Sequence, residues 1–304
     1  MANDPSTSDK PAVPIPPEEH LDVVTPAEAG VQSHQPWIPG LQETGDPARR
    51  TSGGLASAGM TREHRPDSIQ IFGCRIDRLT YATALERVRS FMASSRPHQI
   101  VTANPLMLMD ARLDQELTEV INAADMVVPE SSGIRWASQQ LGTPLDVFLP
   151  GIDLFLGMCR MANEDGLSVF LLGAEPGVAD KAAVSLRGNF PELHIAGTHH
   201  GYFASPQEEA AVVEIIRALC PDMLFVAMSV PKQEKWIRSH LDELNVPVVM
   251  GVGGSFDVIS GRLRRAPLWM REFGLEWLFR TLQQPWRINR LLRLPLFVWK
   301  ILRS

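Results

Sequence analysis

Short apolar runs alternate with helical periodicities over most of the chain. IQIFGCRI predicts two short strands that meet at Gly73, and QIVTAN, DMVV, LSVFLLG, LHIAGT, DMLFVAM and VPVVMGVG predict longer ones. Apolar residues spaced by three and four predict helices over residues 80–94, 106–123, 134–141, 152–163, 176–190, 206–220 and 231–244. Strands that are apolar throughout and alternate with helices indicate a parallel sheet covered on both faces. We therefore expect a Rossmann-like, mostly parallel α/β domain over residues 67–260.

The two ends of the chain depart from this pattern. Ten of the 24 prolines lie in residues 1–66, where no apolar period persists, so this segment is predicted to be disordered. Its central part, TPAEAGVQSHQPWIP, resembles translated intergenic repeats, which makes Met60 a candidate for the native start.

Residues 261–304 form a second distinct end, with ten basic residues against two acidic ones. Trp and Leu interleave there with Arg, and Pro285 and Pro295 divide the segment into short helices. This composition is typical of an amphipathic helical appendage that lies in an anionic membrane interface. The alternative is that these helices pack on the body with their arginines in solvent. Nucleic acid is a less favoured partner, because the rest of the chain is acidic and carries no binding motif.

The remaining composition is that of an ordinary cytoplasmic protein. The formal net charge is −6 and 44% of the residues are hydrophobic. The cysteines, Cys74, Cys159 and Cys220, are widely spaced, as expected of unpaired thiols in a reducing compartment. No apolar run reaches the ~18–20 residues of a membrane span, and no secretory signal opens the chain. The oligomeric state stays open, a homo-oligomer included.

Candidate site residues follow the strands, because ligands of open α/β sheets bind beyond the carboxyl ends of the strands. Glu130 follows DMVV in the stretch PESSG, where a carboxylate is either a solvated turn residue or a working acid or base. The glycine-rich turns LLGAEPG and GVGGSFD suit a phosphate, although each could be purely structural. Lys232 and Gln233 begin a helix and could bind a diphosphate and a sugar or base, or could be a solvated helix start.

The pair His199–His200 raises the question of a metal ion. Neighbouring residues on an extended segment face opposite ways, so these histidines are expected to be loop or ligand-contact residues. HExxH and CxxC motifs are absent from the sequence. The sequence therefore predicts neither a metal ion nor a cofactor.

Seven stretches, taken in order, resemble the WecG/TagA/CpsF family of bacterial glycosyltransferases. They are TANPLMLMDAR, ADMVVPESSGIRWA, LPGIDL, VFLLGAEPGVADKAA, GTHHGYF, PDMLFVAMSVPKQEKWI and GVGGSFDVISGRLRRAPLWMREFGLEWLFRTLQQPWR, covering roughly residues 68–293. The resemblance implies a Rossmann-like fold. It further implies transfer of an N-acetylmannosamine-type sugar from a UDP donor to a polyprenyl-diphosphate-linked sugar, with inversion and without a metal ion. The location implied is the cytoplasmic face of the membrane, with the basic appendage helping to bind membrane and substrate.

The resemblance also assigns roles to residues. Inverting transfer needs a base for the acceptor hydroxyl, and the family's base is the aspartate of a PDG motif, which corresponds to Glu130. The family's active-site threonine and glutamine correspond to Thr102 and Gln233, and Asn104 is expected to contact the donor sugar. The expected substrate-binding set, including stabilisers of the leaving diphosphate, comprises Gly173, Lys232, Gly253, Gly254, Asp257, Arg264, Arg265, Arg271 and Arg280.

This chain departs from the family at the base itself, because it has PESSG in place of PDG. Glutamate keeps the carboxylate on a side chain one methylene longer, so base chemistry survives if the pocket is set back. The two serines are expected either to hydrogen-bond the carboxylate or to replace a tight glycine turn. One alternative is a catalytically inactive, membrane-associated scaffold of a polysaccharide assembly complex. The other, a dinucleotide-dependent oxidoreductase, lacks its G-x-G-x-x-G fingerprint.

Overall fold

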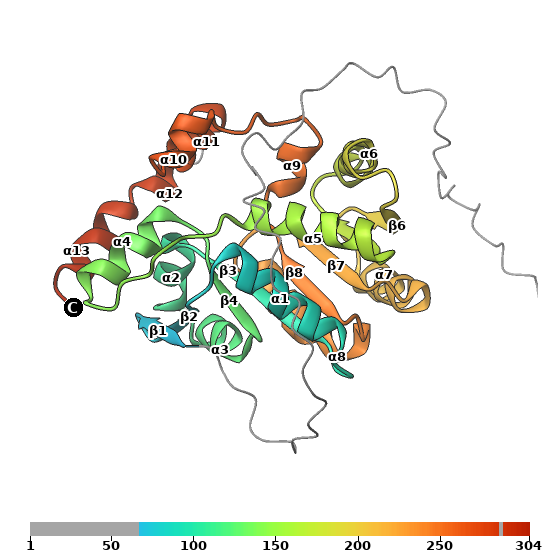
Figure 1. Ribbon diagram of the computed structural model, residues 1–304, viewed down its shortest axis with the longest axis horizontal. Helices are drawn as coiled ribbons and strands as arrows, with labels where there is room; N and C mark the ends of the chain where they lie inside the picture. The colour runs from blue at the N-terminus through green and yellow to red at the C-terminus, as the bar shows by residue number, and fades with distance from the viewer. Residues whose placement is uncertain (1–66, 286–287) are drawn as a thin grey trace, which may run out of the picture. The chain divides into compact units, whose positions relative to one another are not determined.

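Six parallel strands form the central sheet, in the order β4-β3-β8-β7-β5-β6 (Figure 1). Their bounds are β3 (His98–Ala103), β4 (Met126–Pro129), β5 (Ser168–Gly173), β6 (His194–His199), β7 (Met223–Ala227) and β8 (Val248–Gly251). The computed structural model describes residues 67–285 and 288–304, all within one unit of the chain. The predictions for residues 1–66, including Met60 as a start, lie outside the described residues. The predicted parallel α/β fold is confirmed.

Helices cover both faces of the sheet. One face carries α1 (Tyr81–Met92), α5 (Gly151–Asp165), α6 (Val178–Asn189) and α9 (Ser255–Ile259). The other carries α2 (Pro105–Ala111), α3 (Gln115–Ala123), α4 (Ser132–Gln140), α7 (Pro206–Leu219) and α8 (Lys232–Leu244). Successive residues of a strand point to opposite faces of the sheet. Phe225 of β7 therefore packs in the core on the face covered by α5, and Leu224 packs on the face covered by α7 and α8. Two buried faces explain why the strands are apolar throughout.

A small hairpin, β1 (Ser68–Ile71) and β2 (Cys74–Asp77), precedes the sheet and confirms the predicted turn at Gly73.

One prediction is wrong: residues 106–123 form two helices rather than one. Asp114 begins α3 as its N-cap, accepting a hydrogen bond from the Leu117 amide at 3.1 Å. Leu113, counted in the predicted apolar face, lies between the helices and is 88% exposed.

The connections diverge at the neighbouring strands β3 and β8, and we call the region beyond the carboxyl ends of β3, β4 and β8 the crevice. After β3 the chain enters α2 on one face of the sheet, whereas after β8 it enters α9 on the other. Ligands of open α/β sheets bind where the connections diverge in this way. Thr102, near the end of β3, is buried and directs its Oγ1 toward the Gly251 carbonyl oxygen of β8, 3.5 Å away. The crevice is therefore where the site should lie.

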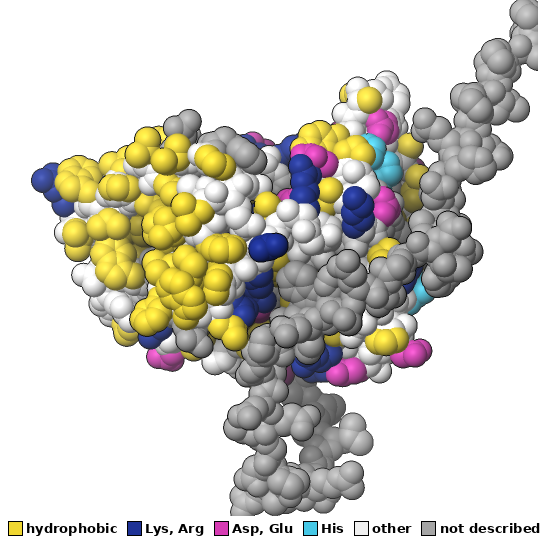
Figure 2. Space-filling view, turned by 90° about the horizontal axis from the view of Figure 1, so that it is seen from above, with side chains coloured by type: hydrophobic (Ala, Val, Ile, Leu, Met, Phe, Trp, Pro, Cys, Tyr) yellow, Lys and Arg dark blue, Asp and Glu magenta, His cyan; other side chains and the backbone are white. Residues whose placement is uncertain are grey.

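The C-terminal appendage consists of α10 (Leu268–Glu272), α11 (Glu276–Gln283), α12 (Ile288–Leu291) and α13 (Leu294–Ile301). Phe297 and Ile301 of α13 are 2% exposed and join the core beneath α2 and α4. Other large apolar side chains of this segment are exposed, and Figure 2 shows hydrophobic side chains gathered over this part of the surface. They are Leu268, Trp269, Phe273, Trp277, Leu278, Leu282, Ile288, Leu292, Leu296, Val298, Trp299 and Leu302. Among the described residues, no helix has the length and apolarity needed to cross a membrane.

Candidate functional site

Glu130 lies at the crevice, directly after β4, the edge strand next to β3. Its backbone amide donates to the Ala103 carbonyl at 3.0 Å, which continues the β3–β4 pairing by one residue and fixes where the side chain begins. The side chain is half-buried. Burial raises the pKa of Glu130 above its usual value, and hydrogen bonding by Asn104 and the positive charge of Arg280 oppose that rise. The residue is therefore a carboxylate in a tuned environment rather than a solvated turn residue.

Two neighbours orient the Glu130 carboxylate. Asn104 is the N-cap of α2: its Oδ1 accepts from the Met107 amide at 3.1 Å, so its Nδ2 must face outward, where it donates to Glu130 Oε2 at 3.1 Å. Gly151, the first residue of α5, donates a backbone hydrogen bond to the carboxylate. A methyl group at Gly151 would lie 3.0 Å from Glu130 Oε1, so only glycine lets the helix approach this closely. The N-terminus of α5 favours the ionised carboxylate.

The two serines of PESSG serve neither of the expected purposes. Ser132 Oγ donates to the Gly274 carbonyl oxygen at 3.3 Å and so holds the loop between α10 and α11. The Ser131 hydroxyl has no hydrogen-bond partner among the described residues. Ser131 is also extended, with φ −135°, which any residue can adopt, so it replaces no tight glycine turn. Of the two serines, Ser132 thus joins the body to the appendage.

Gln233 and Glu234 form a buried polar pair beneath the crevice. Each is 1% exposed. Gln233 Oε1 accepts from the amides of Met228 at 3.3 Å and Gly253 at 3.1 Å, and its Nε2 donates to Glu234 Oε1 at 2.8 Å. A methyl group at Gly251 would lie 2.6 Å from Gln233 Nε2. Gln233 therefore ties the turn after β7 to the turn after β8, so it positions the site rather than facing solvent.

Arg280 of α11 brings a positive charge from the appendage to this site. Its Nη2 lies against Gly254, in the space a side chain there would fill, and its charge lowers the pKa of Glu130. Asp257 lies beside the same turn, and its Oδ1 is 3.6 Å from Arg262 Nη1. Since the Gly253 amide already donates to Gln233, the expectation that this amide meets a phosphate needs correction. Arg280 and the turn at Gly254 remain candidates for contact with an anion.

The other predicted residues lie further out. Gly173 has φ +126° and packs on the backbone of Ala227, so glycine is required there for the fold itself. Lys232 is exposed, with its Nζ 5.8 Å from the centroid of the Phe203 ring. Arg265 is committed to Asp153 of α5 at 2.5 Å. Arg264 is exposed, and Arg271 is partly buried.

The expectation that the side chains of His199 and His200 face opposite ways is wrong. His199 ends β6 and His200 lies just beyond it, where the alternation of strand side chains no longer applies. Their rings are 4.4 Å apart, centroid to centroid, instead of facing opposite ways.

Two residues of the site, Gly151 and Glu234, were not among the predicted site residues. The sequence does contain a pattern that indicates Gly151, because PG before a helical period marks a helix start that can approach a neighbour closely. No sequence pattern indicates Glu234, because a charged residue in the first turn of a helix is ordinarily solvated. Glu234 is buried because α8 packs against β3, where the side-chain Nε2 of Gln99 donates to the backbone carbonyl oxygen of Glu234 at 3.0 Å.

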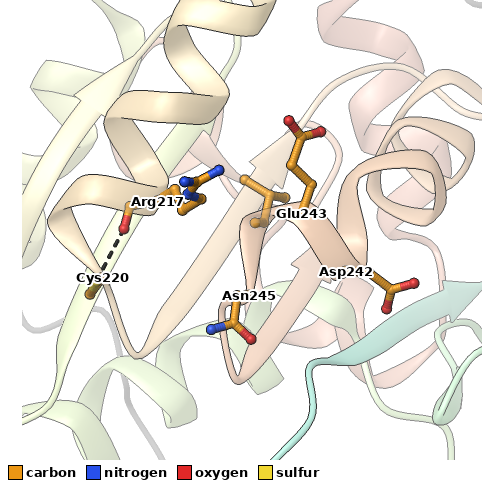
Figure 3. Close-up of a pocket in the computed structure, with 6 residues that line it drawn as sticks. Arg217, Cys220, Asp242, Glu243 and Asn245 are labelled. Atoms are coloured by element: carbon orange, nitrogen blue, oxygen red, sulfur yellow. Dashed lines mark hydrogen bonds between the residues drawn. The ribbon is translucent and has the colours of Figure 1, made fainter.

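A pocket also opens near the amino-terminal ends of the strands, where α7 and α8 end (Figure 3). It is lined by Arg217, Cys220, Asp242, Glu243, Leu244 and Asn245. The Cys220 thiol donates to the Arg217 carbonyl oxygen at 3.0 Å. Because it lies at the amino-terminal edge of the strands, this pocket is remote from Glu130 and is not the site described above.

The chain is similar to a known family of glycosyltransferases. The model of the "Glycosyl transferase WecG/TagA/CpsF family" matches residues 69–304. The chain is 36% identical, over 249 residues, to each of two relatives from Staphylococcus aureus, strains MW2 and NCTC 8325 / PS 47. Both relatives are named N-acetylglucosaminyldiphosphoundecaprenol N-acetyl-beta-D-mannosaminyltransferase. The aligned region covers 81% of this chain and 97% of each relative.

Replacing Glu234 by Gln should flatten the pH dependence of stability. Burial raises the pKa of Glu234 from 4.5 to about 7, so the folded protein holds a proton that the unfolded chain releases. The resulting stabilisation is full below pH 4.5 and is lost as the pH rises through the folded pKa near 7, by at most ~1.4 kcal/mol per pH unit. Urea unfolding across this range measures it, with Glu243→Gln, exposed on the same helix, as the control. A Glu234→Gln variant that kept the wild-type slope would contradict the assignment.

Proposed function

The chain belongs to the WecG/TagA/CpsF family of glycosyltransferases, and from this premise we propose that it transfers an N-acetylmannosamine-type sugar from UDP to a polyprenyl-diphosphate-linked sugar. The reaction proceeds with inversion and without a metal ion, in the synthesis of a cell-surface polysaccharide. The names of the relatives support the acceptor class, because each is named for an N-acetylglucosaminyldiphosphoundecaprenol substrate. The observation that carries the proposal is the Glu130 carboxylate, held ready beneath the crevice by Asn104 and Gly151.

Glu130 serves as the general base. As the acceptor hydroxyl oxygen forms its bond to the anomeric carbon, the bond from that carbon to the UDP oxygen breaks, and the hydroxyl proton passes to Glu130. A base works best with a pKa near the working pH, and burial moves the pKa of Glu130 in that direction. Asn104 and Gly151 oppose this rise in the pKa, because both hydrogen-bond the charged form.

Arg280 and the turn at Gly254 stabilise the departing diphosphate. Negative charge grows on the leaving oxygen, and a fixed cation packed on a glycine turn lowers the energy of that transition state. The guanidinium lies against Gly254 and within electrostatic reach of Glu130. It therefore supplies the positive charge that a divalent ion supplies in metal-dependent enzymes.

The appendage places this site at the membrane. Its exposed Trp, Phe and Leu side chains form an apolar surface, and ten basic residues lie in residues 261–304. Apolar side chains entering the interface and arginines facing anionic headgroups favour peripheral binding to the inner face of the cytoplasmic membrane. A lipid-linked acceptor would then meet the crevice from the side where α11 carries Arg280.

Glu130→Gln should reduce turnover by roughly 10²–10⁴-fold, because the amide keeps the shape of the side chain but cannot accept the proton. The measurement is UDP release from UDP-N-acetylmannosamine with a polyprenyl-diphosphate-linked N-acetylglucosamine acceptor. Glu214→Gln, at a glutamate exposed on α7, is the control and should retain wild-type turnover. Near-wild-type turnover by Glu130→Gln would exclude Glu130 as the base. Absence of UDP release by the wild type would favour the inactive scaffold instead.

Replacing Phe273 and Leu282 together by Ser should weaken binding to vesicles containing phosphatidylglycerol by at least roughly tenfold. These side chains are 75% and 70% exposed, and each would lose apolar area buried in the interface. Co-sedimentation at two salt concentrations measures the effect, and Ile215→Ser on α7 is the control. Equal binding by the double variant and the control would exclude the appendage as the membrane-binding surface.

A further inference from the structure

Three potential metal ligands meet at the end of β6 and the first turn of α7. One ligand atom from each of His199, His200 and Glu208 lies within 4.8 Å of the other two. The histidine rings face one another at 4.4 Å, and Glu208 approaches from the helix that follows. Residues from two elements thus converge on one small volume at the sheet edge formed by β6 (Figure 1).

The hydrogen bonds around His199 and His200 leave nitrogens available for a ligand. His199 Nδ1 lies 2.7 Å from the His200 carbonyl oxygen, and because a carbonyl only accepts, Nδ1 carries the proton. Nε2 of neutral His199 therefore presents its lone pair, an arrangement typical of metal-binding histidines. His200 Nδ1 is buried and has no hydrogen-bond partner among the described residues. A buried ring nitrogen without a partner is costly, and a bound ion would remove that cost.

Glu208 is held in place independently of any ion. Ser205 caps α7 by accepting from the Glu208 amide at 3.2 Å, and Glu208 Oε2 accepts from the Ala204 amide at 2.5 Å. The bond from Ala204 fixes the carboxylate, and its second oxygen, Oε1, has no hydrogen-bond partner among the described residues. The site is thereby largely formed before an ion arrives, which lowers the entropy lost on binding.

We propose that His199, His200 and Glu208 bind a divalent transition metal ion of the zinc type. Two imidazole nitrogens and one carboxylate oxygen suit zinc, whereas magnesium prefers oxygen ligands and retains its water. Ligand distances of about 2.0–2.2 Å require the three side chains to close around the ion by small rotations. Water completes the coordination.

This site lies apart from the proposed chemistry and does not rest on it. β6 and β4 are the two opposite edges of the sheet, and Glu130 follows β4. The ion would instead join β6 to α7 beside Gly201, whose amide donates to the Ala174 carbonyl at 3.2 Å. His199 also stacks on Phe203, which stacks on Trp236 of α8. An ion here would therefore stabilise the side of the fold built from β5, β6, α7 and α8.

Zinc binding to the full, tag-free chain after chelator treatment tests the proposal. Competition with a chromophoric zinc chelator should show one strong site, and zinc should raise the melting temperature because it binds only the folded state. Magnesium at the same concentration should do neither. Co²⁺ should give the visible absorption of a site with nitrogen ligands.

His200→Ala and Glu208→Gln should each weaken zinc binding at least roughly tenfold and abolish the rise in melting temperature. His194→Ala, at an exposed histidine at the start of β6, is the matched control and should bind zinc as the wild type does. The proposal is overturned if the wild type binds no zinc, or if the Glu208→Gln and His194→Ala variants bind it equally. Circular dichroism of each apo variant separates lost binding from lost folding.

Discussion

A half-buried carboxylate is the constraint around which the crevice is arranged. Removing Glu130 from water favours its neutral form, so the fold must supply donors to keep a usable fraction ionised. Asn104 supplies one of them, and its geometry is set by a helix: because its oxygen caps α2, its nitrogen has to face Glu130. Gly151 supplies the other from the start of α5. Two helix starts on opposite faces of the sheet thus converge on one side chain.

The appendage is coupled to this crevice by polar contacts. Ser132 holds the Gly274 loop, Arg265 pairs with Asp153 of α5, and Arg280 lies on the Gly254 turn. The same segment exposes a large apolar surface. A surface suited to a membrane and a cation suited to a diphosphate are therefore carried by one element. Membrane docking and completion of the donor site would be linked in this way.

The sequence predicted the fold well because its signals were local. Strands buried on both faces are apolar throughout, and the polar residues that follow them, such as Glu130, mark the carboxyl edge of the sheet. The misplaced helix boundary at Leu113 has a local cause as well, since Asp114 caps a new helix although the apolar period continues.

What the sequence could not provide depends on tertiary packing. Gln233 and Glu234 have the pattern of a solvated helix start, yet the packing of α8 buries both. Gln233 then bonds to the turns after β7 and β8, and Glu234 accepts a hydrogen bond from Gln233. The juxtaposition of His199, His200 and Glu208 depends on where β6 ends and on how α7 begins. The sequence does not distinguish Gly253 from Gly254. Of these two glycines, Gly253 is the one whose backbone amide donates to Gln233 Oε1.

The most direct test of the central claim, that Asn104 holds Glu130 as a base, is the pH dependence of kcat/KM in an Asn104→Ser variant. Serine still caps α2 but lacks the amide donor. Because the hydrogen bond from Asn104 lowers the pKa of Glu130, its loss should move the acid limb of the profile to higher pH. The rate on the plateau should change much less. An acid limb at the wild-type position in a folded Asn104→Ser variant would contradict the account.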